Sequence, residues 1–111
     1  MYDMDGNRVL CGANVYTQKY YFNERFSMLP EDVRDELQAL CVLYVEDVGG
    51  MILMEFDAEG NLLIRVDSEA GDLSFDEIGS ALKIKQIQRD RRPLLESLEL
   101  FYRTFYLEKD A

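Results

Sequence analysis

Acidic side chains between residues 67 and 77 form the group whose chemistry is easiest to define. Neighbouring carboxylates can bind a divalent cation, and a carboxyl group whose pKa is raised by burial can transfer protons. The weak metal-ligand candidates are Asp67, Glu69 and Asp72. Their spacing does not match the EF-hand loop, which needs alternating oxygen ligands and a glutamate at its last position. We therefore expect no metal, and we keep a small-molecule or divalent-metal site here as the alternative.

Other catalytic groups are scarce in this chain. It contains no histidine, and it has no nucleophile-elbow, phosphate-loop or dinucleotide-binding motif. A pair of carboxylates could still perform acid–base chemistry, but the sequence does not show which pair meets in space. We expect a non-catalytic protein without a cofactor, and an enzyme that uses the acidic 67–77 region is the alternative.

The two cysteines, Cys11 and Cys41, lie thirty positions apart. No CxxC pair exists, so neither a thioredoxin-like motif nor a zinc finger is indicated. Cys41 falls on the apolar face of a predicted helix, where cysteine behaves as a small hydrophobic residue. Cys11 is a weak candidate for a reactive thiol, because only Arg8 is near it in sequence to lower its pKa.

Residues 83–92 are the most basic stretch of the chain. They carry a net charge of +4 while the whole chain carries −10, so the remainder carries −14. This stretch could dock an acidic protein partner, or it could be a solvated helix face that the chain's own carboxylates neutralise. Nucleic acid is an unlikely partner for so acidic a chain, because phosphate neutralisation drives such binding. The basic patch consists of Lys83, Lys85, Arg89, Arg91 and Arg92.

Length and composition predict one domain over residues 1–111, with residues 1–7 a candidate for disorder. Hydrophobic residues make up 48% of the chain, which is enough for a globular core. The acidic beginning is not a signal peptide, and no stretch has the roughly 18 uncharged apolar residues of a membrane span. We therefore expect a cytoplasmic protein that does not enter the membrane.

Alternation of apolar and polar residues predicts an antiparallel sheet. Residues 51–56 and 62–67 form the clearest hairpin, and an aromatic-rich strand is expected over residues 15–22. A short strand over 8–11 would end at a break over 12–14. The outer face of the hairpin keeps more apolar side chains than full exposure favours, namely Met51, Leu53 and Leu63.

Two long helices should cover this sheet, which makes an α+β two-layer fold with three to four strands. The first helix is expected over residues 30–48, from Pro30 to the pair Gly49-Gly50. A strand over residues 40–46 is the competing interpretation, because that stretch is apolar on every side and contains β-branched residues.

The second helix is predicted over residues 74–107. Ser74 and Glu77 match the capping-box pattern that starts a helix. Gly79 is unfavourable inside a helix, and we expect another backbone to cross closely there. Pro93 cannot donate an intrahelical hydrogen bond, so the helix should kink or break near residues 89–93. We expect a bend, and two helices in series are the alternative.

The C-terminal part of this helix is apolar over more than one stripe. A single small domain would not cover all of that surface, and contiguous exposed apolar surface usually marks an interface. We therefore expect a protein–protein interaction module, homodimeric through this helix. The interface candidates are Leu94, Leu98, Phe101, Tyr102 and Phe105.

Several short segments together are characteristic of a known family. They are Cys11-Gly12-Ala13-Asn14, Lys19-Tyr20-Tyr21-Phe22-Asn23, Glu46-Asp47-Val48-Gly49-Gly50, Gly71-Asp72-Leu73, Asp76-Glu77-Ile78-Gly79-Ser80-Ala81-Leu82 and Leu95-Glu96-Ser97-Leu98-Glu99-Leu100. Through them the chain resembles small acidic bacterial proteins of unknown function, of the Gram-positive, clostridial type, over about residues 11–108. The resemblance implies a bacterial cytosolic protein and brings no activity, cofactor or catalytic residue.

Overall fold

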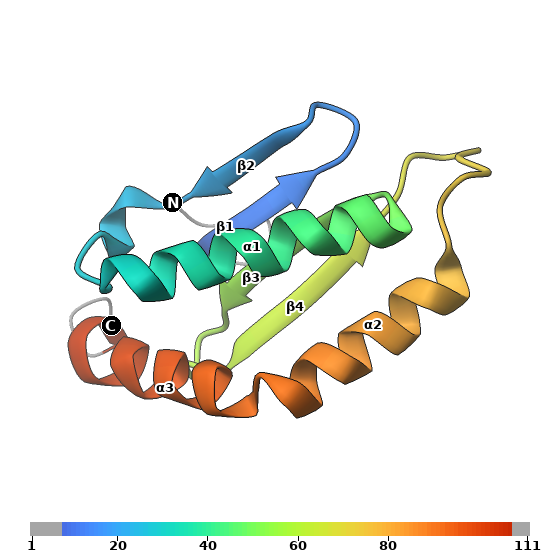
Figure 1. Ribbon diagram of the computed structural model, residues 1–111. Coiled ribbons are helices and arrows are strands. Elements are labelled where there is room, and N and C mark those ends of the chain that lie inside the picture. Colours follow the sequence, from blue (N-terminus) through green and yellow to red (C-terminus); the bar gives the residue numbers. More distant parts are fainter. Residues whose placement is uncertain (1–7, 108–111) are drawn as a thin grey trace.

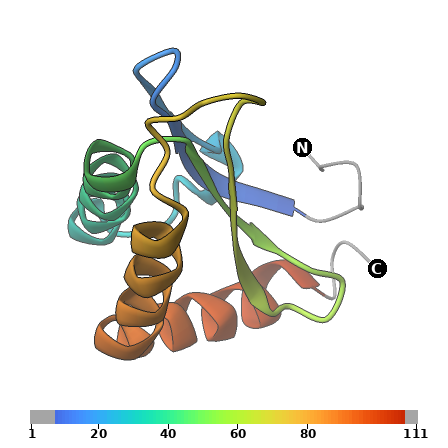
Figure 2. The same cartoon turned by 90° about the vertical axis from the view of Figure 1, so that its right-hand side faces the viewer.

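A four-stranded antiparallel sheet forms one layer of the molecule, and three helices on one side of it form the other (Figure 1, Figure 2). The computed structural model describes residues 8–107; the predicted disorder over 1–7 lies outside this range. The elements in chain order are β1 (Arg8–Asn14), β2 (Lys19–Phe22), a 3-10 turn (Glu24–Phe26), α1 (Glu31–Val48), β3 (Met51–Phe56), β4 (Leu62–Asp67), α2 (Glu77–Asp90), α3 (Arg92–Tyr102) and a wide last turn (Arg103–Leu107). The predicted α+β fold is confirmed.

The predicted hairpin is confirmed as β3 and β4. Its register pairs Met51 with Asp67 at the open end, next to α1, and Phe56 with Leu62 beside the turn. The turn is fixed by Asp57, whose Oδ1 accepts the backbone N–H groups of Glu59 and Asn61. The sheet order is β2-β1-β3-β4, so β1 and β3 are its central strands.

The predicted bounds of the first two strands are wrong. Strand β1 continues through residues 12–14, where a break was expected, and residues 15–18 form the turn before β2 instead of the first half of a strand. Gly12 lies within β1. A glycine is needed there because a Cβ would lie 2.7 Å from the carbonyl oxygen of Ile52 on β3. The close approach of two central strands therefore explains a glycine that looks like a break in the sequence.

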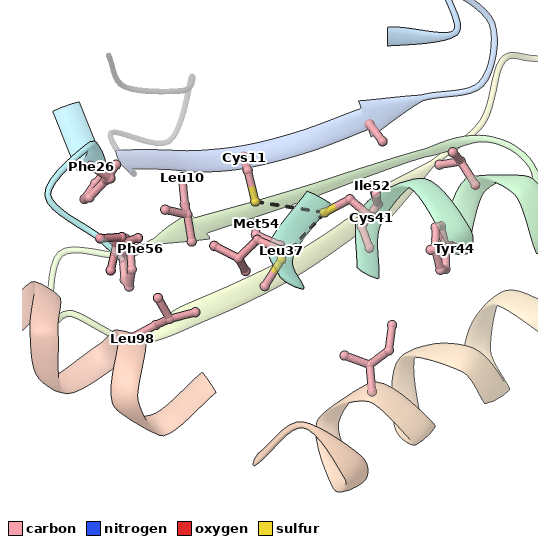
Figure 3. Packing of buried hydrophobic residues seen from close by; sticks show 14 of the residues in the cluster. Leu10, Cys11, Phe26, Leu37, Cys41, Tyr44, Ile52, Met54, Phe56 and Leu98 are labelled. Carbon is pink, nitrogen blue, oxygen red and sulfur yellow. Dashed lines mark hydrogen bonds between the residues drawn. The ribbon is translucent and has the colours of Figure 1, made fainter. Parts of the chain in front are cut away.

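Helix α1 covers the inner face of the sheet, and the predicted helix is confirmed over this region. The competing strand over residues 40–46 does not occur. Gly49, with φ of 83°, and Gly50, with φ of 71°, turn the chain from α1 into β3. Figure 3 shows the buried core between α1 and the sheet, which includes Leu10, Leu37, Cys41, Tyr44, Ile52, Met54 and Phe56.

The N-cap of helix α2 lies two residues later than the capping-box pattern predicts. Asp76, not Ser74, is its N-cap, and the Asp76 Oδ1 accepts the backbone N–H of Gly79 at 2.8 Å. The glycine makes room for this cap, because a Cβ at Gly79 would collide with the Asp76 carboxylate. The expected crossing of another backbone at Gly79 is therefore wrong, and the Ser74 side chain instead donates to Asp72.

The segment predicted as one bent helix over 74–107 forms two helices in series, which was the alternative, and they are separated at Arg91 within the predicted 89–93 range. Helix α2 ends at Asp90, and Arg91 has the non-helical angles φ −109° and ψ 18°. Pro93 then lies in the first turn of α3, where its missing N–H is not needed. Pro93 thus helps to start a new helix. Its position in the sequence does not by itself distinguish this role from a kink within one helix.

Aromatic rings join α3 to the far end of the sheet. The ring centroids of Phe56 and Tyr102 are 4.2 Å apart in a stacked arrangement, and Phe26 lies 5.6 Å from Phe56. The Tyr106 hydroxyl donates to the carbonyl oxygen of Arg25 at 2.7 Å. These contacts close the core at the end opposite to Gly49.

Leu98 on α3 packs into the core with 1% of its surface exposed, whereas Leu100 two residues later is 67% exposed. Leu98→Ala should lower the free energy of unfolding by about 2–5 kcal/mol, because it leaves a cavity. The matched change Leu100→Ala should alter it by no more than about 0.5 kcal/mol. Urea denaturation followed by circular dichroism measures both, and equal effects would contradict this packing.

Candidate functional site

The outer face of the sheet carries two rows of side chains that cross all four strands. Cross-strand pairing places Tyr21, Gly12, Leu53 and Arg65 in the first row. The second row contains Lys19, Asn14, Met51 and Asp67. Because side chains alternate along a strand, both rows point away from the helices. In the first row, Gly12 and Leu53 form an apolar centre between Tyr21 and Arg65. In the second row, Met51 is the apolar residue, and the charged Lys19 and Asp67 lie on the two edge strands.

A groove of about 530 Å³ lies over these rows, and such a volume is within the usual range for small-molecule sites. Its floor is formed by Gly12, which has no side chain of its own, and by Leu53 and Met51. Leu53 leans toward Gly12, since its Cδ1 would be 3.1 Å from a Cβ at that glycine. Tyr21 forms one wall and is 41% exposed. The site is therefore an open, mostly apolar groove.

The opposite end of the outer face is closed. Glu55 on β3 is buried there, and its Oε1 accepts a hydrogen bond from Arg65 Nη1 at 2.8 Å. Val9 on β1, which pairs with Glu55, is buried as well. The Arg65 side chain thus lies at the boundary, with its guanidinium held by a buried carboxylate while half of its surface stays exposed.

The turn between β1 and β2 forms the polar end of the groove. The Oδ1 of Asn14 accepts the backbone N–H groups of Tyr16 and Thr17, at 2.8 and 3.3 Å. Thr17 and Lys19 are exposed beside it and also line the groove. Because Asn14 Oδ1 accepts hydrogen bonds from the turn, the amide N–H groups are the donors that remain on this side chain.

The acidic candidates Asp67, Glu69 and Asp72 do not gather at one point among the described residues. Asp72 accepts hydrogen bonds from the Ser74 hydroxyl at 2.6 Å and from the Tyr16 hydroxyl at 2.5 Å. The same Tyr16 oxygen accepts the backbone N–H of Glu69. Asp67 lies apart in the second row of the groove. Among residues 8–107, no three cysteine or acidic side chains gather as metal ligands would. Asp72 instead ties the β4–α2 loop to the β1–β2 turn.

The basic patch is spread over α2 and the start of α3, and three of its members contact carboxylates. Lys83 Nζ lies 2.7 Å from Asp47 Oδ2, and Arg89 Nε lies 2.8 Å from Asp90 Oδ1. Arg91 Nη1 lies 3.3 Å from Glu36 Oε2 on α1. Lys85 and Arg92 are exposed. A smaller hollow of about 210 Å³ lies beside these pairs, between α1 and α2.

The interface candidates on the C-terminal helix divide between core and surface. Leu98 and Tyr102 belong to the buried core, so they are not available to a partner in this fold. Leu94 and Phe101 are partly buried and pack against the core. Phe105 is 44% exposed, and its ring contacts that of Phe101 with centroids 5.4 Å apart. Most of the wide apolar surface that the sequence predicts for this helix is thus buried within one chain.

Both cysteines lie in the core (Figure 3), where their sulfur atoms are 3.9 Å apart. Cys41 also lies 3.8 Å from the sulfur of Met54. The hydrogen bond with Cys11 and burial together raise the pKa of Cys41. The prediction that Cys41 is a core residue agrees with this placement, and Cys11, the candidate reactive thiol, is equally inaccessible.

Sequence reasoning missed the groove because its residues come from all four strands. Gly12, Lys19 and Arg65 carry no recognisable motif, and they meet only through the register of the sheet. One indication was available: Met51 and Leu53 lie on the outer face of the predicted hairpin and are more apolar than exposure favours. Both line the groove.

The fold and groove define a two-layer α+β protein with one partly open sheet face. The chain belongs to a family of unknown function, DUF6145, whose model matches residues 7–110. Comparisons with curated proteins and with solved structures gave no significant match. Within residues 8–107, no helix is both long and apolar enough to span a membrane.

The hydrogen bonds that Ser74 and Tyr16 donate lower the pKa of Asp72. A carboxyl group with a lowered folded-state pKa adds stability above its unfolded pKa of about 3.9, and this contribution is lost as the pH falls through the folded pKa. Asp72→Asn should therefore destabilise the protein at pH 7, and the difference from the wild type should shrink below about pH 4.

Urea denaturation at a series of pH values measures this dependence, with Asp35→Asn, an exposed acid on α1, as the control. The control should show a smaller effect of substitution at neutral pH. A loss of stability in Asp72→Asn that stays constant across the pH range would show that the ionised carboxylate does not hold the loop.

Proposed function

We propose that this protein is a non-catalytic binding module and that it holds a small ligand in the outer-face groove. One observation carries the proposal: a concavity of about 530 Å³ opens on apolar groups of the sheet, on the side that the helices do not cover. Ligand sites are typically concave and mostly apolar, with a few polar groups that orient the ligand. The groove has this composition, with Leu53 and Met51 at the centre and polar groups on the edge strands.

The position of the groove on central strands supports binding by a preformed surface. Gly12 and Leu53 belong to β1 and β3, which are paired on both sides within the sheet. The inner sides of these strands pack against α1 through the core. A ligand would meet side chains whose positions are already fixed, so little conformational entropy would be lost on binding.

Self-association through the C-terminal helix is a second candidate. It is favoured by two exposed apolar residues, Leu100 on α3 and Phe105 in the last turn. The buried Leu98 and Tyr102 give it no support, so the contact would be smaller than the sequence suggests. A docking role of the basic patch for an acidic partner, and a cytoplasmic location, both stay predictions.

Binding in the groove can be tested with naphthamide, a neutral flat aromatic probe, by amide NMR titration. Resonances of Gly12, Tyr21 and Leu53 should shift together. Leu53→Gln should weaken binding about tenfold, because it replaces the apolar centre of the floor by an amide. Leu82→Gln is the matched control, since Leu82 is exposed on α2 and does not line the groove.

Shifts that cluster instead between α1 and α2, or that respond equally to the two variants, would refute binding in this groove. A circular dichroism spectrum and a thermal transition recorded for each variant establish that both are folded. The comparison therefore reports on the groove and not on the stability of the sheet.

Self-association is tested by sedimentation velocity at micromolar concentration. If the second candidate holds, the wild type sediments as a dimer and Phe105→Gln as a monomer, because the substitution removes an exposed apolar contact. Leu73→Gln serves as the control, since Leu73 is fully exposed outside the C-terminal helix. A wild-type monomer would rule out this dimer at that concentration.

A further inference from the structure

We propose that the ligand of the outer-face groove is an organic anion with a flat apolar body, and that its anionic group lies at the β1–β2 turn beside Lys19. This inference rests on the proposed function and adds the chemical class and the orientation of the ligand. Three features carry it: the shape of the floor, the donors at the turn, and the distribution of charge along the two rows.

The floor favours a flat body. Tyr21 and Leu53 stand on the strands to either side of Gly12, and neighbouring strands are about 4.8 Å apart. Leu53 leans toward the glycine, so its side chain lies beside the bare Gly12 backbone. A planar ring system can contact the Gly12 backbone, the Leu53 side chain and the Tyr21 ring at once. Contact with the Tyr21 ring adds an aromatic interaction to this apolar contact.

The turn end of the groove offers hydrogen-bond donors. Lys19 contributes an ammonium group, Thr17 a hydroxyl group, and Asn14 the N–H groups of its amide. All three residues line the groove within a stretch of six positions. No ion pair between described residues involves Lys19, whereas three members of the basic patch contact carboxylates. A carboxylate or phosphate-type group fits this donor set.

The other edge of the groove is less suited to an anion. Arg65 on β4 already donates to the buried carboxylate of Glu55. Asp67, two residues further on the same face of β4, is the one acidic residue among those that line the groove. Its charge would repel an anion placed there. The charges therefore direct the anionic group of the ligand toward β2 and leave the apolar body over β1 and β3.

Naphthoate and its neutral analogue naphthamide separate the anionic group from the apolar body. In amide NMR titrations both probes should shift Gly12, Tyr21 and Leu53, and naphthoate should also shift Thr17 and Lys19. Naphthoate should bind about three- to tenfold more tightly, the factor that an exposed ion pair and a charge-assisted hydrogen bond give. This difference should diminish as the salt concentration is raised.

Lys19→Met removes the charge and keeps an unbranched apolar stem, so it should lower naphthoate affinity to that of naphthamide. Lys85→Met on α2 makes the same change in net charge outside the groove and should leave both affinities unchanged. Equal affinities for the two probes, or equal effects of the two variants, would overturn the anion inference while the proposed function stands. If neither probe shifts groove residues, both proposals fail.

Discussion

The helices of a two-layer fold cover only one face of its sheet, and the rest of this structure depends on that constraint. Helix α1 packs on the inner face, where Cys11, Met54 and Ile52 meet Leu37 and Cys41 in one core. Apolar burial of this kind is the main favourable term in folding. The helices do not cover the outer face, so its side chains are not needed for this core and can have another function. The centre of its open half carries the apolar side chains of Met51 and Leu53, which solvent contact alone does not favour.

The helices also fix the sheet from its edges. Helix α3 holds the β3–β4 turn, because Glu99 accepts the backbone N–H of Leu62 at 2.8 Å and Arg103 donates to Asn61 at 2.6 Å. At the other end the Tyr16 hydroxyl joins the β1–β2 turn to the loop before α2. Both hairpins are thus held through residues that do not line the groove. The register that aligns its two rows is set by the whole fold.

Elements with strong local patterns could be predicted from the sequence. The β3–β4 hairpin and α1 follow from alternation, from helical spacing and from the Gly49-Gly50 pair. The predicted end of β1 was too early. In a sequence, a glycine where two strands approach closely cannot be told from a glycine at a break. The start of α2 was misplaced because Ser74 and Asp76 both fit a capping pattern, and only tertiary contacts decide between them.

The candidate site was harder to predict than the fold. An apolar stripe on a helix faces either its own core or a partner, and Leu98 and Tyr102 face the core. Their periodicity is the same in both cases, so the sequence could not distinguish them. The groove depends on cross-strand neighbours such as Tyr21, Gly12 and Leu53, which no single segment contains. A site formed by register becomes visible only when the strand order is known.

The most direct test of a binding groove on the open sheet face is a crystal structure of the protein with naphthoate. We expect the ring system to lie over Gly12 and Leu53 against Tyr21, with the carboxylate within hydrogen-bond distance of Lys19. Naphthoate bound between α1 and α2, or bound over the sheet with its carboxylate beside Asp67, would contradict it.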